Sequence, residues 1–305
     1  MAFIASRSYR YRVIDVFSEE PLLGNQLGVF PDSLSLDTAT MQKIAKELNV
    51  AETVFLGPAT RPDCAARVRI FTPGREMPFA GHPTVGSGFM VRELGLVPAD
   101  ADRFVLEENI GPVPVRIEKG DGGRPLIWFT TPPIRVGAGL DGAACAHALG
   151  LETSDLLGKP PEIVSAGNPG VFIALKNKDA VDRAMLDLGA ARKLHDEPIF
   201  IFPFTPSREG AYSRMFAPDH GVAEDPATGS ATGPLAAYMM RHGLTPAADG
   251  TRLISEQGTK MGRRSILHIL IHGANGADGI DVGGYVTPVI EGVLTIQLAR
   301  EAQSH

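Results

Sequence analysis

Two turns rich in glycine and proline, residues 81–87 and 224–230, lead into segments with helical patterning, and each carries an ionisable side chain. His82 stands in the first turn and Asp225 in the second. The start of a helix presents unpaired backbone N–H groups and a partial positive charge, which bind carboxylates and phosphates. A histidine and a carboxylate beside such an anion site form an acid–base pair. The two turns therefore predict proton transfer on a small anion held between them.

Each candidate residue also has an ordinary structural interpretation. Asp225 is by default an N-cap, and His82 a loop residue bonded to local backbone. Their matching positions in a sequence repeat favour the catalytic interpretation. A third candidate, Glu52, lies between an amphipathic helix and a strand. It is either a buried acid with a raised pKa or an exposed acid of an edge strand, and the residue pattern alone favours exposure.

The two turns belong to a repeat that runs along most of the chain. At one constant spacing, Gly24 matches Gly167, Asn25 matches Asn168, Pro83 matches Pro226, Gly86 matches Gly229 and Ser87 matches Ser230. Arg69-x-Phe71 also matches Arg214-x-Phe216, and Gly95-Leu96 matches Gly243-Leu244. We attribute the wider spacing of the last match to an insertion of five residues inside the second helix. This alignment makes His82 and Asp225 equivalent.

Hydrophobic periodicity places regular elements around the two turns. Apolar residues at helical spacing predict a helix over 41–48, with Ser35 or Asp37 as the N-cap and Asn49 at its end. Two further helices are predicted at 83–94 and 227–242. Alternating and β-branched runs predict strands at 11–17, 53–56, 67–71, 104–107, 113–118, 126–129, 171–175, 198–202, 266–271 and 293–298.

These elements predict an α+β fold of two pseudo-symmetric halves. In each half a mostly antiparallel sheet wraps around a central helix, and the active site lies in the cleft between the halves. We expect the N-terminal half at 1–125 and the C-terminal half at 126–285. The tail at 286–305 is expected to cross back and complete the sheet of the first half.

Composition excludes several classes of protein. The 305 residues carry a net charge of −6 without a basic stripe, so a nucleic-acid partner is not expected. Cys64 and Cys145 are too few for a disulfide scaffold. The absence of a signal-like start and of a long apolar run predicts a cytoplasmic protein without a membrane partner. No nucleotide loop, metal-ligand spacing or nucleophile elbow around Ser230 is present, so neither a cofactor nor a metal is expected.

Several motifs in chain order resemble one known family. They are Gly24-Asn25-Gln26, Met41-Gln42-Lys43-Ile44-Ala45, Ala51-Glu52-Thr53-Val54-Phe55, Arg69-Ile70-Phe71-Thr72-Pro73, Pro78-Phe79-Ala80-Gly81-His82-Pro83-Thr84, Glu224-Asp225-Pro226-Ala227-Thr228-Gly229-Ser230-Ala231 and Gln257-Gly258 with Gly262-Arg263. Together they identify the chain as similar to the PhzF-like phenazine-biosynthesis family, relatives of diaminopimelate epimerase with the same duplicated fold.

The resemblance implies a role for each candidate residue. Glu52 becomes the general acid/base of a cofactor-independent isomerase, which overrules the exposed interpretation. In the phenazine-pathway member, a glutamate at this place moves a proton between carbons of trans-2,3-dihydro-3-hydroxyanthranilate. The resemblance assigns His82, Asp225 and Ser230 to holding and polarising the substrate. It also assigns backbone N–H groups near Gly81 and Gly229 to the substrate carboxylate, and it implies a homodimer.

One departure and two alternatives bear on the reaction. The epimerase relatives use two cysteines, one from each half, where this chain has His82 and Asp225, and Cys64 and Cys145 lie outside the matched motifs. Two-thiol racemisation is therefore not expected. The first alternative is an epimerase or lyase that acts on another small carboxylate with the same residues. The second is a carboxylate-binding protein without catalysis.

Overall fold

The computed structural model describes residues 6–297, and strands make up most of its mixed α/β fold. The strands are β1 (Ser6–Val16), β2 (Asn25–Phe30), β3 (Glu52–Gly57), β4 (Ala66–Phe71), β5 (Glu76–Met77), β6 (Arg103–Glu108), β7 (Gly111–Lys119), β8 (Pro125–Thr130), β9 (Arg135–Gly139), β10 (Glu162–Ser165), β11 (Pro169–Ala174), β12 (Phe200–Pro206), β13 (Gly210–Ser213), β14 (Arg252–Gln257), β15 (Ser265–His272), β16 (Gly279–Gly284) and β17 (Val286–Gln297).

Helices connect many of these strands. The α-helices are α1 (Thr38–Leu48), α2 (Gly81–Glu93), α3 (Gly142–Ala148), α4 (Lys178–Arg183), α5 (Leu188–Ala191) and α6 (Gly229–Arg241). Short 3-10 turns are η1 (Asp121–Gly123), η2 (Thr153–Asp155), η3 (Pro218–His220), η4 (Thr259–Met261) and η5 (Ala274–Gly276). Among the residues that the structure describes, no helix is long and apolar enough to cross a membrane.

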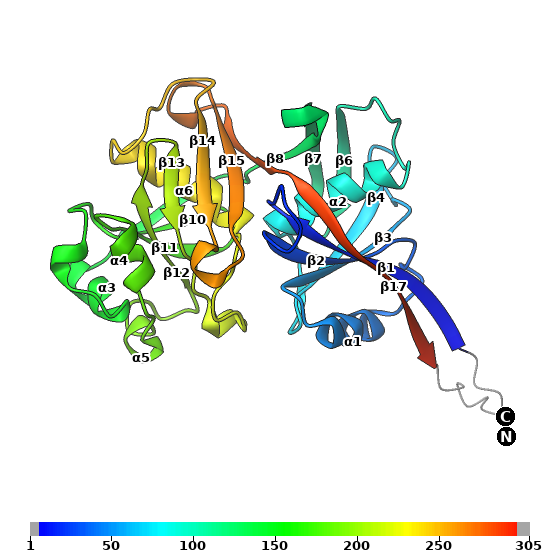
Figure 1. The fold of residues 1–305 in the computed structure, drawn as a ribbon, viewed down its shortest axis with the longest axis horizontal. Coiled ribbons are helices and arrows are strands. Elements are labelled where there is room, and N and C mark those ends of the chain that lie inside the picture. The colour runs from blue at the N-terminus through cyan, green and yellow to red at the C-terminus, as the bar shows by residue number, and fades with distance from the viewer. Residues whose placement is uncertain (1–5, 298–305) are drawn as a thin grey trace.

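Figure 1 shows the elements gathered into two groups. One group contains β1–β4, β6, β7, α1 and α2, and the other contains β10–β15 with α3, α4 and α6. Strand pairing continues from one group to the other, because β8 pairs with β7 on one edge and with β16 on the other. Backbone hydrogen bonds therefore connect both groups directly.

The order of strand pairings repeats in the two groups. β1–β2 is antiparallel, β2–β3 parallel, β3–β4 antiparallel and β4–β6 parallel, followed by antiparallel β6–β7 and β7–β8. The series β10–β11, β11–β12, β12–β13, β13–β14, β14–β15 and β15–β16 has the same alternation of directions. Most pairings are therefore antiparallel, with parallel ones at corresponding places.

Each group is built around a helix that is buried on nearly all sides. In α2 every residue from Gly81 to Val91 is buried, and α6 is buried from Ala231 through Ala236. A helix whose residues are apolar or small on every face is typical of a protein core rather than of a surface. Val85 and Met90 of α2 pack in one hydrophobic cluster, and Leu235 and Tyr238 of α6 pack in another. The two helix starts are held in place by these cores.

Helix α1 lies over one sheet and ends just before the first site residue. Asp37 caps its start by accepting a hydrogen bond from the Thr40 N–H, and Asn49 ends it in a left-handed conformation. Both capping predictions are confirmed, with Asp37 rather than Ser35 at the N-cap. Met41, Ile44 and Ala45 form the buried face. This packing fixes where β3 begins.

The last described strand returns to the first. β17 pairs antiparallel with β1 from Val286 opposite Val16 to Gln297 opposite Ser6. The predicted tail at 286–305 therefore lies along the N-terminal strand as far as Gln297, and its remainder, 298–305, falls outside the described residues. The predicted boundaries at 125/126 and 285/286 stay predictions.

Candidate active site

The starts of α2 and α6 touch each other at two glycines. A Cβ atom added to Gly81 would lie 2.7 Å from both the Gly229 carbonyl carbon and the Ser230 nitrogen. Only glycine permits so close an approach of two backbones. The N-cap residues, Ala80 and Thr228, provide no side-chain cap, and neither first turn contains an acid. The free N–H groups of both helices are therefore available to an anion.

The two helices correct the sequence alignment. α2 and α6 each contain 13 residues and begin at Gly81 and Gly229, so the second residue is His82 in one and Ser230 in the other. The predicted insertion inside the second helix is therefore wrong, because the extra residues precede α6. Asp225 lies in the loop before that helix and is not the positional counterpart of His82.

A pocket opens at this junction and is lined by residues of both groups. The space, including its open mouth, measures about 780 Å³. Its lining includes all six predicted site residues, which are Glu52, Gly81, His82, Asp225, Gly229 and Ser230. Apolar side chains from both groups complete much of the wall, namely Met77, Phe200, Met215, Ala217 and Val222. The predicted residues therefore converge on one cavity.

Glu52 and His82 face each other within this pocket. Glu52 Oε2 lies 3.2 Å from His82 Nε2, and only 18% of the Glu52 side chain and 5% of the His82 side chain are exposed. Burial, followed by the nearby charge of Asp225, raises the pKa of Glu52 well above its ordinary value. Burial lowers the pKa of His82 to about 3, so the imidazole is neutral. Burial therefore favours the neutral form of both side chains.

Asp225 is held rigidly on the other side of the pocket. Asn25 Nδ2 donates a hydrogen bond to Asp225 Oδ1 at 2.8 Å, and Thr228 Oγ1 donates one to Oδ2 at 2.5 Å. Burial raises the pKa of Asp225 to about 6, although these two donors act in the opposite direction. Burial of these two carboxyl groups near each other therefore favours the protonated form of each.

Sequence reasoning missed two supporting residues. Asn25 lies within 3.3 Å of His82 Nδ1 and bonds to Asp225, so it connects the two sides of the site. Gln257, the last residue of β14, donates to the Asp225 backbone carbonyl at 2.7 Å and to Thr228 Oγ1 at 3.0 Å. The signal was present, because both residues lie in the motifs Gly24-Asn25-Gln26 and Gln257-Gly258. Sequence alone did not indicate what they would contact.

Behind the start of α2 lies another buried acid. Thr84 Oγ1 lies 2.8 Å from the Ala80 carbonyl and 2.8 Å from Glu108 Oε1. The Thr84 hydroxyl donates to these two acceptors, and its bond to Glu108 lowers the pKa of that carboxyl group. Burial outweighs this bond and raises the pKa of Glu108 to about 8. This neutral carboxyl supports α2 from behind.

The pocket also contains polar residues that the sequence did not single out. Arg75, in the turn between β4 and β5, and His220, at the end of η3, both line it. Cys64 and Cys145 are free thiols and are not among the lining residues. Within 6–297, no group of three or more histidine, cysteine or acidic side chains is arranged to hold a metal ion.

Comparison with known proteins agrees with the geometry. A family model described as phenazine biosynthesis-like protein matches residues 14–292. An uncharacterized isomerase of Mesorhizobium japonicum is 39% identical over 302 residues, which covers 94% of this chain and 98% of that protein. A trans-2,3-dihydro-3-hydroxyanthranilate isomerase of Pseudomonas aeruginosa is 37% identical over 289 residues, with 93% and 98% covered.

A solved structure extends the similarity to the fold. The crystal structure of a phenazine biosynthesis protein of the PhzF family from Bacillus anthracis has a TM-score of 0.86 to this chain. It is 27% identical, and the match covers 94% of this chain and 99% of that one. The similarity therefore spans both groups of elements as well as the pocket between the helix starts.

Proposed function

The chain belongs to the phenazine biosynthesis-like protein family and is an isomerase of that family, and we propose that it moves a proton between two carbons of a small cyclic or amino-acid-like carboxylate. The observation that carries this proposal is the Glu52–His82 contact at 3.2 Å beside two uncapped helix starts. It combines a proton carrier and an anion site in one cavity. No redox step is needed for such an isomerisation.

Glu52 acts as the acid and the base of the proposed reaction. Its ionised form takes a proton from one carbon, and its protonated form returns a proton to another, so the atoms balance. Burial and the charge of Asp225 raise the pKa of Glu52, which makes its protonated form more accessible than that of an ordinary glutamate. Neutral His82, whose Nε2 lies 3.2 Å from Glu52 Oε2, helps to position the carboxyl group.

The helix starts stabilise the charge that develops on the substrate. Removal of a proton from carbon places negative charge on the conjugated carboxylate. Backbone N–H groups at Gly81, Gly229 and Ser230 belong to uncapped first turns and are fixed by the cores around α2 and α6. Such preorganised donors lower the barrier without reorganisation. Asp225, fixed by Asn25, orients polar groups of the substrate on the opposite side.

The architecture in this proposal is a duplicated one. The repeated order of strand pairings supports two pseudo-symmetric halves, at 1–125 and 126–285, with the segment from 286 completing the first and the active site in the cleft between them. The proposal includes a homodimer, which the family resemblance supports. Sedimentation at micromolar concentration tests it, and a monomeric mass contradicts the dimer.

Proton NMR in deuterium oxide tests the proposed reaction. Trans-2,3-dihydro-3-hydroxyanthranilate and a panel of small amino and hydroxy acids are incubated with the wild type and, in parallel, with Glu52→Gln. We expect deuterium to enter one carbon of a substrate with the wild type only. Exchange that persists in Glu52→Gln removes this residue from the mechanism.

The same experiment separates the alternatives. Inverted configuration at the exchanging carbon identifies an epimerase, and loss of a substituent identifies a lyase. Shifted ligand signals without any exchange identify a binding protein that lacks catalysis. Migration of a double bond together with deuterium incorporation identifies the proposed isomerase.

A further inference from the structure

The outer part of the pocket carries two basic side chains from different segments. Arg75 and His220 are exposed lining residues, whereas His82 and Asp225 lie at the inner end with little or moderate exposure. Arg75 comes from the β4–β5 turn and His220 from η3. The two segments thus bring a guanidinium and an imidazole to the mouth of the cavity, one from each group of elements.

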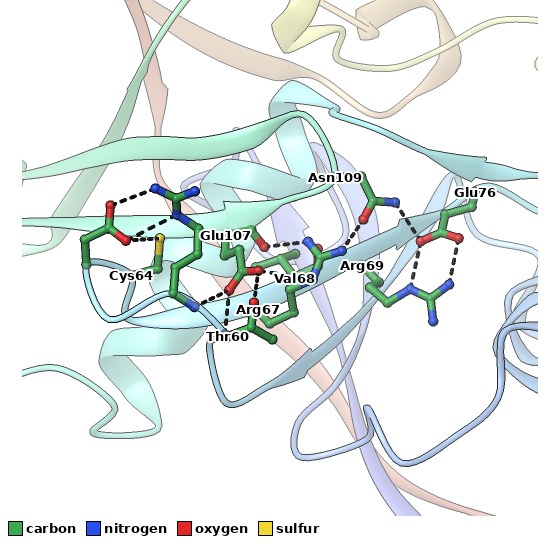
Figure 2. Close-up of polar contacts among 10 residues, drawn as sticks. Thr60, Cys64, Arg67, Val68, Arg69, Glu76, Glu107 and Asn109 are labelled. Carbon is green, nitrogen blue, oxygen red and sulfur yellow. Dashed lines mark hydrogen bonds and ion pairs between the residues drawn. The ribbon is translucent and has the colours of Figure 1, made fainter.

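The acid next to Arg75 is held by another residue. Glu76 accepts hydrogen bonds from Arg69 Nε at 2.8 Å and Nη2 at 2.7 Å, and a third from Asn109 Nδ2 at 2.8 Å (Figure 2). Asn109 is in turn bonded to Arg67, as Figure 2 also shows. In the described part of the chain, no carboxylate lies within 4.0 Å of the Arg75 guanidinium. Its charge is therefore free to meet a ligand.

The acid next to His220 is also held by a different arginine. Asp219 Oδ1 accepts hydrogen bonds from Arg192 Nε at 3.1 Å and Nη2 at 2.5 Å. Partial burial and the charge of Arg75 lower the pKa of His220, while Asp219 opposes this shift. The charge of Arg75 therefore acts on His220 at the mouth of the pocket. Both neighbouring acids are paired with other arginines, so neither of them neutralises the positive charge of Arg75 at the mouth.

We propose that this pocket takes substrates with two anionic groups, one at the inner helix starts and a second carboxylate or similar oxyanion at Arg75, with His220 beside it. The inference rests on the proposed function for the inner carboxylate site. The same cavity is lined by apolar side chains such as Met77 and Met215, which suit the carbon skeleton of a small diacid. Arginine binds a carboxylate through two parallel N–H groups, which adds orientation as well as affinity.

Binding of matched acids tests the proposal without turnover. Succinate, glutarate and adipate are each compared with their monoamide by calorimetric titration of the wild type at low salt. For at least one chain length we expect the diacid to bind about five- to tenfold more tightly than its monoamide, because an exposed charge-assisted contact is partly screened. Added salt at molar concentration reduces this preference.

Variants identify the residue responsible. Arg75→Gln is expected to abolish the preference for the diacid and to leave monoamide affinity unchanged. Arg135→Gln makes the same charge change at an exposed position of β9 outside this pocket and is expected to keep the preference. Thermal melting of both variants checks that they are folded. His220→Gln is expected to reduce the preference less than Arg75→Gln.

Three outcomes overturn the proposal: equal affinity of diacid and monoamide at every length, a preference that persists in Arg75→Gln, and no measurable binding of any of the six acids. Glu52→Gln separates this result from the proposed reaction. That variant is expected to keep the diacid preference although it loses proton exchange. A pocket that prefers diacids but never exchanges protons would contradict the reaction and leave the second anion site standing.

Discussion

The starts of α2 and α6 are alike in construction and unlike in chemistry. Each helix has 13 residues and begins with glycine, and each has a threonine whose hydroxyl donates to the carbonyl four residues earlier. Those bonds are Thr84 to Ala80 at 2.8 Å and Thr232 to Thr228 at 3.0 Å. The second residue, however, is His82 in α2 and Ser230 in α6. Backbone geometry is thus shared while the side chains at the pocket differ.

The same contrast extends to the supporting residues. Arg69 and Arg214 occupy matching places in the sequence repeat, and each forms a two-pronged ion pair with an acid that follows it by seven or ten residues, Glu76 or Glu224. Glu52, the proposed proton carrier, begins β3, whereas Phe200 begins the corresponding strand β12. Both helix starts can thus serve as the anion site, whereas the proposed proton transfer belongs to the first group of elements. Substitutions there are expected to reduce turnover most.

The largest effect is expected for Glu52→Gln. The amide preserves size and polarity but cannot exchange a proton with carbon, so kcat is expected to fall at least about 10³-fold. Ligand binding is expected to persist. Rates of deuterium incorporation measure the loss, and Glu47→Gln, an exposed glutamate at the end of α1, is the matched control with unchanged rate. A variant with more than a tenth of wild-type exchange contradicts the assignment.

The next largest effect is expected for His82→Ser, which makes the first helix start resemble the second. Loss of the imidazole leaves Glu52 without its neighbour at 3.2 Å, and kcat is expected to fall about 10²-fold. Ser230→Ala removes only a hydroxyl, so a loss of about tenfold or less is expected there because the backbone donors remain. Measuring kcat of His82→Ser and Ser230→Ala side by side tests this order. Equal losses would mean that the two helix starts contribute equally.

A third effect concerns stability at the contact between the helices. Gly81→Ala places a Cβ 2.7 Å from backbone atoms that cannot move aside, and we expect a loss of about 1–3 kcal/mol. Gly229→Ala meets the tip of the Phe17 ring at 3.1 Å and the backbone of Gly81 at 3.2 Å, so its loss is expected to be smaller. Urea unfolding measures both values. The reverse order would show that the tight contact relaxes freely.

The smallest effect is a change in how stability depends on pH. Burial raises the pKa of Glu108 from 4.5 to about 8, so the folded protein binds a proton there that the unfolded chain releases. This contribution is fully present below pH 4.5 and is lost as pH rises through about 8. Glu108→Gln places a neutral amide of the same shape at the end of β6, where the corresponding strand β14 ends in Gln257. This variant is expected to lose less stability than the wild type as the pH rises. Urea midpoints from pH 5 to 9 measure it. An unchanged pH profile would mean that Glu108 is ionised in the fold.

Features that depend only on neighbouring residues, such as helix caps, were predicted correctly from the sequence. Asp37 and Asn49 mark the ends of α1 because capping needs few neighbours. The alignment of the second helix failed because glycines recur for different reasons. Position 86 requires glycine because a Cβ atom there would lie 2.4 Å from the Leu27 side chain. Gly229, in contrast, lies against the backbone of Gly81. Matching the two glycines therefore shifted the predicted helix alignment.

The site was predicted less completely than the helices. Local pattern favoured an exposed Glu52, because its burial comes from segments far away along the chain, including the loop that carries Asp225. Only the family resemblance reversed that interpretation. Arg75 and His220 gave no signal, because an exposed basic residue in a turn is ordinary until two distant turns face the same cavity. The burial of Glu52 and the meeting of Arg75 with His220 both depend on contacts between distant segments, which local sequence patterns do not indicate.

The pairing of β1 with β17 has a consequence for the order of events during synthesis. β1 can pair with β2 early, but it acquires its second partner, β17, only after residues 286–297 have been made, when almost all of the described chain already exists. Until then one edge of β1 is unpaired and open to other strands. The group that contains Glu52 and His82 therefore completes its strand pairing last, although most of its residues are made before those of the other group. Contacts so far apart along the chain also favour slow folding.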